Sequence, residues 1–210
     1  LSLVRQFPAY KAHTESGGWD FSHAAPIPRL NEMTLGVIAY GRLGSRVAKK
    51  AGEFFDTRLA YDPYVLDTQI ELAGVEPVGF DELLERSDVI TLHPPLTEET
   101  REMIDAEAFE KMGEDVILVN TSRGGVIDHD ALLSALEDGT LAGAGLDVLS
   151  EEPPGEDDSL LQRDDTIITP HVAFYSEGSM EELRRKAADE VKRTIEGRET
   201  RSPVGEPYWL

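Results

Sequence analysis

Short apolar runs alternate with polar stretches of helical composition over most of the chain. Runs of this kind become buried parallel strands, and the stretches between them become crossover helices. Repeated strand–helix alternation predicts an α/β fold, a doubly wound parallel sheet with helices on both faces. The predicted strands lie at residues 35–38, 58–61, 75–78, 88–93, 116–119, 141–148 and 166–169.

Acidic residues in front of helical stretches predict where helices begin, because an Asp side chain accepts hydrogen bonds from the free N–H groups of a first turn. Asp81, Asp105 and Asp128 are the predicted caps. One long helix is predicted from about Ser176 to Glu196. It keeps an apolar stripe at helical spacing, formed by Met180, Leu183, Ala187, Val191 and Ile195.

The residues before the first strand have a different character. Residues 1–18 look like the end of a helix that Pro8 interrupts, and Trp19 and the segment 26–28 indicate an extended arm. Such an arm packs on its own domain or on a partner subunit, and its aromatic and proline content favours the partner. The chain therefore divides into a connecting helix and arm (1–33), a strand–helix domain (34–175), and a C-terminal helix and tail (176–210).

A glycine-containing turn joins the first predicted strand to a helix, in the stretch Thr34–Gly44, TLGVIAYGRLG. Gly41 would let the backbone approach a pyrophosphate, and Gly44 would let helix and strand pack closely. The helix N-terminus would offer free N–H groups to the phosphates. These features predict an NAD-binding Rossmann fold, although Ala39 replaces the first glycine of the usual Gly-x-Gly-x-x-Gly pattern. Any other tight strand-to-helix turn would explain the stretch equally well.

An acidic residue at the end of the second strand bears on the choice of cofactor. Asp62 follows Gly41 by 62 − 41 = 21 residues. At that distance a carboxylate can accept hydrogen bonds from the adenosine ribose and would repel a 2′-phosphate. The sequence therefore favours NAD over NADP.

The charge of the chain excludes several classes of partner. Lys and Arg number 20 against 41 Asp and Glu, a net charge of −21 that repels nucleic acid and anionic membranes. There is no cysteine, so disulfides and thiolate metal sites are excluded. No signal-peptide pattern and no apolar run near the roughly 20 residues of a membrane span are present, so we expect a cytoplasmic protein. The acidity fits an ordinary acidic enzyme or a halophilic one, and the scarcity of lysine favours the second.

Polar residues gather where the predicted strands end. Ligands of doubly wound sheets bind beyond the carboxyl ends of the strands, so a rim of such residues predicts a site. The rim comprises Asp62, His93, the segment 120–123, Asp147 and His171.

Three residues have the chemistry that hydride transfer to a carbonyl requires. Arg123 can pair with a substrate carboxylate and polarise the adjacent carbonyl. His171 can donate a proton, since histidine titrates near neutral pH, and Glu152 can orient the imidazole. Each residue also has an ordinary explanation: a surface ion pair for Arg123, a solvated acidic loop for Glu152, and a helix-approach position for His171.

The ordered motifs resemble those of the D-isomer-specific 2-hydroxyacid dehydrogenase family, in its phosphoglycerate dehydrogenase-like and C-terminal-binding-protein-like branch. The resemblance covers about residues 1–200 and implies Arg123, Glu152 and His171 as the catalytic set. It also implies an NAD-dependent hydride transfer between nicotinamide and a D-2-hydroxyacid or 2-ketoacid of the phosphoglycerate, hydroxypyruvate or glyoxylate class. The motifs are LGVIAYGRLG, Asp62, LHPPLTEETREMI, ILVNTSRGGVID, LAGAGLDVLSEEP and TPHVAFYS.

The resemblance also implies a set of cofactor-binding residues and no metal. Arg42 and Leu43 would meet the pyrophosphate, Pro94 would border the adenosine, and Thr121 and Asp147 would lie near the nicotinamide. The whole implied set is Tyr40, Gly41, Arg42, Leu43, Gly44, Asp62, Pro63, His93, Pro94, Thr100, Asn120, Thr121, Ser122, Arg123, Asp147 and His171.

The sequence departs from the family pattern in three respects. Ala39 replaces a glycine, and Phe174 stands where the C-terminal-binding-protein-like members have tryptophan. By the resemblance, we expect the sequence to start beyond the family's N-terminal substrate domain of about a hundred residues, inside the connecting helix. We therefore expect an isolated cofactor domain that binds NAD and turns over weakly or not at all. The glutamate at position 152 separates the chain from formate dehydrogenases, which have glutamine there.

Two alternatives remain besides the enzyme. The first is a non-catalytic NAD(H)-sensing scaffold that resembles C-terminal-binding protein, and the second is a Rossmann domain that binds no nucleotide. The presence of Arg123, Glu152 and His171 favours the enzyme, since a sensor needs no positioned acid. The resemblance further implies a homodimer formed through the cofactor domain.

Overall fold

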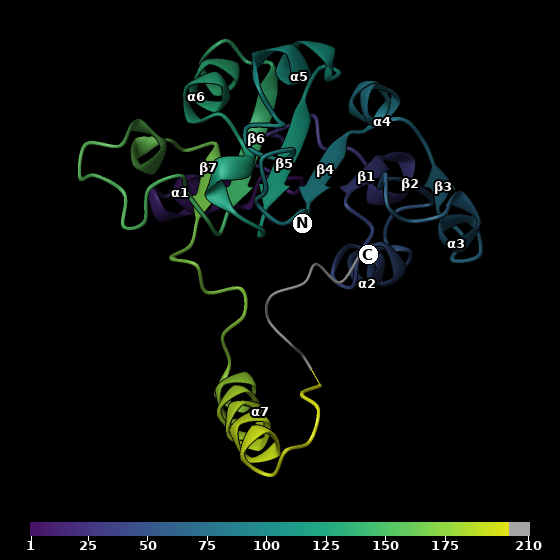
Figure 1. Cartoon of the computed structure of the whole chain (residues 1–210). Coiled ribbons are helices and arrows are strands. Elements are labelled where there is room, and N and C mark those ends of the chain that lie inside the picture. Colours follow the sequence, from purple (N-terminus) through teal and green to yellow (C-terminus); the bar gives the residue numbers. More distant parts are fainter. Residues whose placement is uncertain (202–210) are drawn as a thin grey trace. The chain divides into compact units, whose positions relative to one another are not determined.

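The computed structural model describes residues 1–201; the predicted tail beyond Arg201 lies outside the described residues. The chain forms two compact units, Leu1–Pro170 and a second that begins at His171. The first unit contains the whole sheet (Figure 1).

The seven strands form one parallel sheet in the order β3-β2-β1-β4-β5-β6-β7. This order confirms the predicted doubly wound sheet, and it reverses direction between β1 and β4, where such sheets bind ligands. The bounds are β1 Thr34–Ile38, β2 Thr57–Tyr61, β3 Glu76–Pro77, β4 Val89–Leu92, β5 Val116–Asn120, β6 Leu141–Leu146 and β7 Thr166–Ile168.

Helices cover both faces of the sheet and close two separate hydrophobic clusters. One cluster contains Leu84, Phe109 and Leu136 from α4, α5 and α6, which lie on the same side of the sheet in Figure 1. The other contains Ala48 from α2 and Ile70 from α3. The bounds are α2 Gly44–Ala51, α3 Asp67–Glu71, α4 Phe80–Arg86, α5 Ala106–Lys111 and α6 His129–Glu137, with short 3₁₀ turns η1 Leu30–Glu32, η2 Gly124–Val126 and η3 Ser159–Gln162.

Two of the three predicted N-caps are confirmed. The Asp105 side chain accepts a hydrogen bond from the Ala108 N–H, and Asp128 caps α6 in the same way. The prediction for Asp81 is wrong, because α4 begins at Phe80 with Gly79 at its N-cap. Asp81 instead lies in the first turn, where its carboxylate favours the helix dipole and lies 3.1 Å from the Lys111 ammonium.

The prediction that Pro8 interrupts a helix is also wrong, because helix α1, Phe7–Glu15, begins there. Proline is accommodated in a first turn, whose N–H groups have no partner within the helix. The residues before α1 pack on the sheet: Val4 is buried in the second cluster, and Leu3 packs against it. The Leu3 side chain lies 3.4 Å from where a Gly143 Cβ would be, so it covers β6.

The arm that follows α1 leaves its aromatic side chains uncovered. Trp19 is 94% exposed and Phe21 is 92% exposed. Of the two interpretations of the arm, packing of Trp19 on its own domain is therefore excluded in this structure.

The second unit contains the predicted long helix, α7, Glu177–Ile195. Ser176 caps it reciprocally with Ser179: each hydroxyl accepts a hydrogen bond from the backbone N–H of the other residue. The apolar stripe on α7 is largely exposed, with Val191 at 60% and Ile195 at 80%. Within residues 1–201, no helix combines the length and apolar character needed to cross a membrane.

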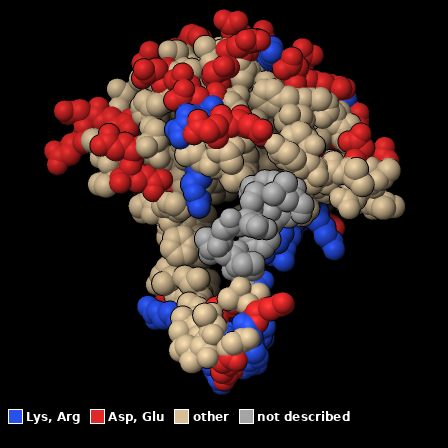
Figure 2. Space-filling model, viewed as in Figure 1, with Lys and Arg blue, Asp and Glu red and all other residues tan. Residues whose placement is uncertain are grey.

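Negative charge is concentrated in the first unit. Residues 1–170 contain 13 Lys and Arg against 33 Asp and Glu, a net charge of 13 − 33 = −20. Figure 2 shows several groups of acidic side chains on the visible face of this unit, with few basic ones. The charge of the whole chain is therefore almost entirely a property of the sheet-containing unit.

Candidate functional site

The turn after β1 brings strand and helix into direct contact. A Cβ on Gly44 would lie 2.0 Å from the Ala39 carbonyl oxygen, so only glycine fits there. A Cβ on Gly41 would meet nothing within 4 Å, which leaves that side of the turn open. The turn thus has the close packing and the open backbone that were predicted for a phosphate-binding site.

Ala39 adopts a conformation that favours glycine. Its φ is +70°, in the left-handed region, while its N–H donates to the Tyr61 carbonyl at 2.8 Å. A side chain in this region costs about 1 kcal/mol or more. The missing first glycine therefore leaves the shape of the turn intact but strains its backbone.

We expect Ala39→Gly to raise the free energy of unfolding by about 0.5 kcal/mol, because relief of strain outweighs the greater entropy of unfolded glycine. Urea denaturation measures this effect, and NADH titration should give equal or tighter binding. The matched control is Ala48→Gly in α2, which should lower the free energy of unfolding by about 1 kcal/mol. A clear loss of stability or of NADH affinity in Ala39→Gly would contradict the strained conformation of the turn.

The Asp62 carboxylate is tied to the turn as well as to its own strand end. Its Oδ2 accepts from the Tyr40 N–H at 2.7 Å, and its Oδ1 accepts from the Tyr64 N–H at 2.9 Å. The Tyr40 side chain points away from this edge into the second cluster and is 6% exposed, and burial raises the pKa of its hydroxyl. Tyr40 therefore contributes to the edge through its backbone.

Residues after β4 form the neighbouring wall. The His93 imidazole Nε2 lies 3.1 Å from the Thr91 hydroxyl, and burial lowers the pKa of His93 to about 4. Thr100 accepts from the Thr97 N–H at 2.8 Å and donates to the Pro95 carbonyl at 2.5 Å, which braces the loop. His93 is thus neutral at physiological pH and lies beside a rigid turn.

Neutral His93 predicts a specific pH dependence of stability. The unfolded side chain protonates near pH 6.5, whereas the folded one protonates only near pH 4. Stability should therefore fall as the pH drops through that interval. We expect His93→Gln to remove about 2 kcal/mol of this loss, after allowance for partial solvent access. Urea denaturation at pH 4.5 and pH 7.5 tests it, with His129→Gln as the control; equal pH dependence in wild type and His93→Gln would contradict it.

A hydrogen-bond network joins the ends of β5, β6 and β7 and includes the buried residues Asn120, Ser122 and Asp147. Asn120 is fully buried; its Oδ1 accepts from the Ser122 N–H and hydroxyl, and its Nδ2 donates to the Arg123 carbonyl at 2.9 Å. The Asp147 N–H donates to the Asn120 carbonyl, and the Thr169 hydroxyl donates to the Asp147 carboxylate at 2.5 Å. Thr169 was absent from the predicted set, although its position at the end of a strand was a usable signal.

The loops that carry Arg123 and Glu152 touch through their backbones. A Cβ on Gly124 would lie 1.9 Å from the Leu149 carbonyl, so glycine is required at this contact. The Glu152 carboxylate accepts from the Leu149 N–H at 3.1 Å, and an Arg123 guanidinium nitrogen donates to the Ser122 carbonyl at 2.6 Å. The role of Gly124 was not predicted, although the Gly124-Gly125 pair marks it in the sequence.

The structure brings most of the predicted residues to one edge of the first unit. Arg42 and Leu43 are exposed on the turn, Pro63 and Thr121 are exposed after β2 and β5, and Pro94 is buried after β4. His171 is different, because it begins the second unit. There its φ is +49°, and its ring meets the Phe174 ring edge-on at 6.3 Å. Its place in the catalytic set stays a prediction.

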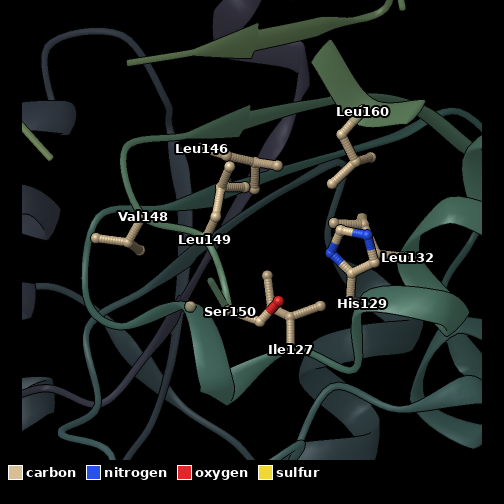
Figure 3. Close-up of a pocket in the computed structure, with 9 residues that line it drawn as sticks. Ile127, His129, Leu132, Leu146, Val148, Leu149, Ser150 and Leu160 are labelled. Atoms are coloured by element: carbon tan, nitrogen blue, oxygen red, sulfur yellow. The ribbon is translucent and has the colours of Figure 1, made fainter. Parts of the chain in front are cut away.

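A small hollow is lined in part by Gly124, Leu149 and Ser150, which lie in the loops next to Arg123 and Glu152 (Figure 3). Its cavity volume is about 10 Å³, far below the roughly 300–1,000 Å³ of small-molecule sites. Its walls are mainly aliphatic and it shares no residue with the glycine turn, so we interpret it as imperfect packing. The lining residues are Gly124, Ile127, His129, Leu132, Leu146, Val148, Leu149, Ser150 and Leu160.

Fold and turn together define a dinucleotide-binding domain of the Rossmann class. The strand order, the open face at Gly41, the helix that begins at Gly44 and the carboxylate of Asp62 all fit NAD. Residues 1–173 match the family model "D-isomer specific 2-hydroxyacid dehydrogenase, NAD binding domain". The chain belongs to this family and comprises its NAD-binding domain.

Curated relatives and solved structures agree with this assignment. The chain is 38% identical to D-3-phosphoglycerate dehydrogenase of Archaeoglobus fulgidus over 99% of the chain and 39% of that protein. It is 39% identical to glycerate dehydrogenase of Methylorubrum extorquens over 94% of the chain and 63% of that protein. A D-lactate dehydrogenase from Aquifex aeolicus, solved with NAD and lactic acid, superposes with a TM-score of 0.85 at 37% identity, over 93% of this chain and 63% of that one. The chain thus spans less than two thirds of each.

Proposed function

We propose that the protein is an NAD-dependent oxidoreductase that transfers a hydride between nicotinamide and a D-2-hydroxyacid or 2-ketoacid. The substrate class is phosphoglycerate, hydroxypyruvate or glyoxylate. The observation that carries the proposal is the backbone contact at Gly124, which places the Arg123 and Glu152 loops side by side at the carboxyl edge of the sheet. Relatives named for these activities support it.

The residues of this chain would divide the reaction between them. Bound NADH supplies the hydride that reduces the carbonyl carbon. Arg123 pairs with the substrate carboxylate and polarises the carbonyl, and its loop is held by Asn120. His171 donates a proton to the carbonyl oxygen, and Glu152 orients the imidazole. Asp62 accepts hydrogen bonds from the adenosine ribose.

The test offers the whole protein hydroxypyruvate, glyoxylate or phosphohydroxypyruvate as the substrate and measures the oxidation of NADH by its absorbance. We expect turnover of at least one of them and weak or no turnover by the 210-residue chain alone. The matched variant is Arg123→Gln, which should lose most of the turnover. Normal NADH binding without turnover of any 2-ketoacid by the whole protein would favour the sensing scaffold instead.

The same proposal includes a homodimer formed through residues 1–33. The nearly complete exposure of Trp19 and Phe21 supports it, because uncovered large aromatic side chains are typical of an interaction surface. Light scattering tests the proposal, and a monomer at micromolar concentration would contradict it.

A further inference from the structure

A side-chain bridge crosses the carboxyl end of β1. Tyr64 follows β2 and Glu99 follows β4, the two strands that flank β1. The Tyr64 hydroxyl nevertheless donates a hydrogen bond to the Glu99 carboxylate, across 35 residues of sequence. Since the glycine turn begins where β1 ends, this bridge joins the loops that follow the strands on either side of that turn.

Each end of the bridge is anchored through its backbone. The Tyr64 N–H donates to the Asp62 carboxylate at 2.9 Å, and the same carboxylate accepts from the Tyr40 N–H in the glycine turn. On the opposite side, Glu99 lies in the loop that Thr100 braces with hydrogen bonds to residues 95 and 97. The two loops therefore have defined positions even when the bridge between them is broken.

The bridge itself is easily broken. Tyr64 is 63% exposed and Glu99 is also exposed, so water competes for both groups. Hydrogen bonds of this kind contribute little net free energy, because the separated partners are solvated. The Glu99 hydrogen bond raises the pKa of Tyr64, so the phenol remains a donor throughout the physiological range.

The bridge lies over the adenosine half of the cofactor site. In Rossmann domains the acidic residue at the end of the second strand binds the adenosine ribose, and Tyr64 follows Asp62 by two residues. An adenosine that reaches Asp62 must therefore pass between the loop of Tyr64 and the loop of Glu99. The bridge joins these two loops.

We propose that the Tyr64–Glu99 bridge is a latch over the adenosine half of the NAD site, which must open before the cofactor enters. The apparent association rate constant is then the rate constant of the open form multiplied by the fraction of molecules in which the latch is open. The inference rests on NAD binding by this domain and not on the proposed reaction, so a substrate outside the 2-ketoacid class would leave it unaffected.

Stopped-flow fluorescence of NADH binding tests the latch with Tyr64→Phe, which keeps the ring and removes the hydroxyl. We expect the association rate constant to rise about three- to tenfold, a factor that corresponds to the loss of one exposed hydrogen bond. Glu99→Ala should give a similar rise, and the double variant should give no more than either single one, because both changes break the same bond.

Glu98→Ala is the matched control, since it removes a neighbouring carboxylate outside the bridge. The association rate constant of Glu98→Ala must stay below that of Glu99→Ala. Equal rate constants would mean that removal of any nearby negative charge speeds association, and would refute the latch. An unchanged association rate in Tyr64→Phe would also overturn the proposal. So would weaker NADH binding in that variant, which would mean that the hydroxyl holds the cofactor instead of blocking its entry.

Discussion

Arg123→Gln should lower kcat/KM for 2-ketoacid reduction about 10³-fold in the whole protein, a much larger effect than on NADH affinity. Glutamine cannot form the two parallel charged hydrogen bonds that a guanidinium makes with a carboxylate, and it cannot stabilise negative charge that develops on the carbonyl oxygen. A loss of this size corresponds to about 4 kcal/mol of transition-state stabilisation. Steady-state kinetics with saturating NADH measures it.

Two further variants separate charge from geometry. Arg123→Lys keeps the charge without the planar fork and should recover only part of the activity. Arg163→Gln is the matched control, because Arg163 pairs with Asp165 before β7, at the opposite edge of the sheet. If Arg123→Gln retained more than about a third of wild-type kcat/KM, the substrate-binding role of this residue would be wrong.

Gly44→Ala should destabilise the protein by about 3 kcal/mol or more and abolish most NADH binding. The added Cβ would lie 2.0 Å from the Ala39 carbonyl oxygen and 3.1 Å from its carbon. Backbone atoms cannot rotate away as a side chain can, so α2 must move off β1. Overpacking of this kind costs about 1–3 kcal/mol even where side chains can yield. Thermal and urea unfolding measure the loss.

Gly41→Ala distinguishes packing from ligand contact within the same turn. Its Cβ would meet no atom of the protein within 4 Å, so the free energy of unfolding should change by less than about 0.5 kcal/mol. The methyl group would instead occupy the open side of the turn, and we expect the Kd for NADH to rise at least about tenfold. Equal effects of the two substitutions on stability would contradict this division of roles.

The parallel sheet was predictable because its strands are apolar and regularly separated by helical stretches. Val37 and Leu118 are fully buried on their strands, as a sheet covered on both faces requires. Asp105 and Asp128 were predictable as caps because each immediately precedes an apolar helical pattern. In these cases local chemistry and tertiary packing favour the same conformation.

Predictions failed where two local interpretations competed. Asp81 suits an N-cap and a first helical turn equally well, and the phenyl ring of Phe80 packs against the core cluster, which places the helix start one residue earlier. A proline can either end a helix or lie in its first turn, and nothing in the local composition around Pro8 distinguishes the two cases. The left-handed φ of Ala39 was not predicted either, because it depends on the approach of α2 to β1.

For the candidate site, residue types were more predictable than their connections. The sequence placed Asp62, Asn120 and Asp147 at strand ends, and the structure confirms those positions. It did not reveal that Asn120 uses its side chain to hold the Arg123 loop, or that Gly124 touches Leu149. Contacts between loops that follow different strands depend on sheet register, which sequence periodicity does not specify.

The packing of Leu3 on β6 has a practical consequence for anyone who wishes to transplant this domain. Gly143 and Gly145 give β6 no side chains of its own at two positions, and Leu3 lies within 3.6 Å of where a Cβ would be at either one. A graft that begins at the first strand would leave that surface of the sheet bare to water and to other chains. A transplantable module must therefore extend far enough before β1 to include Leu3 and Val4, which form an integral cover of the sheet.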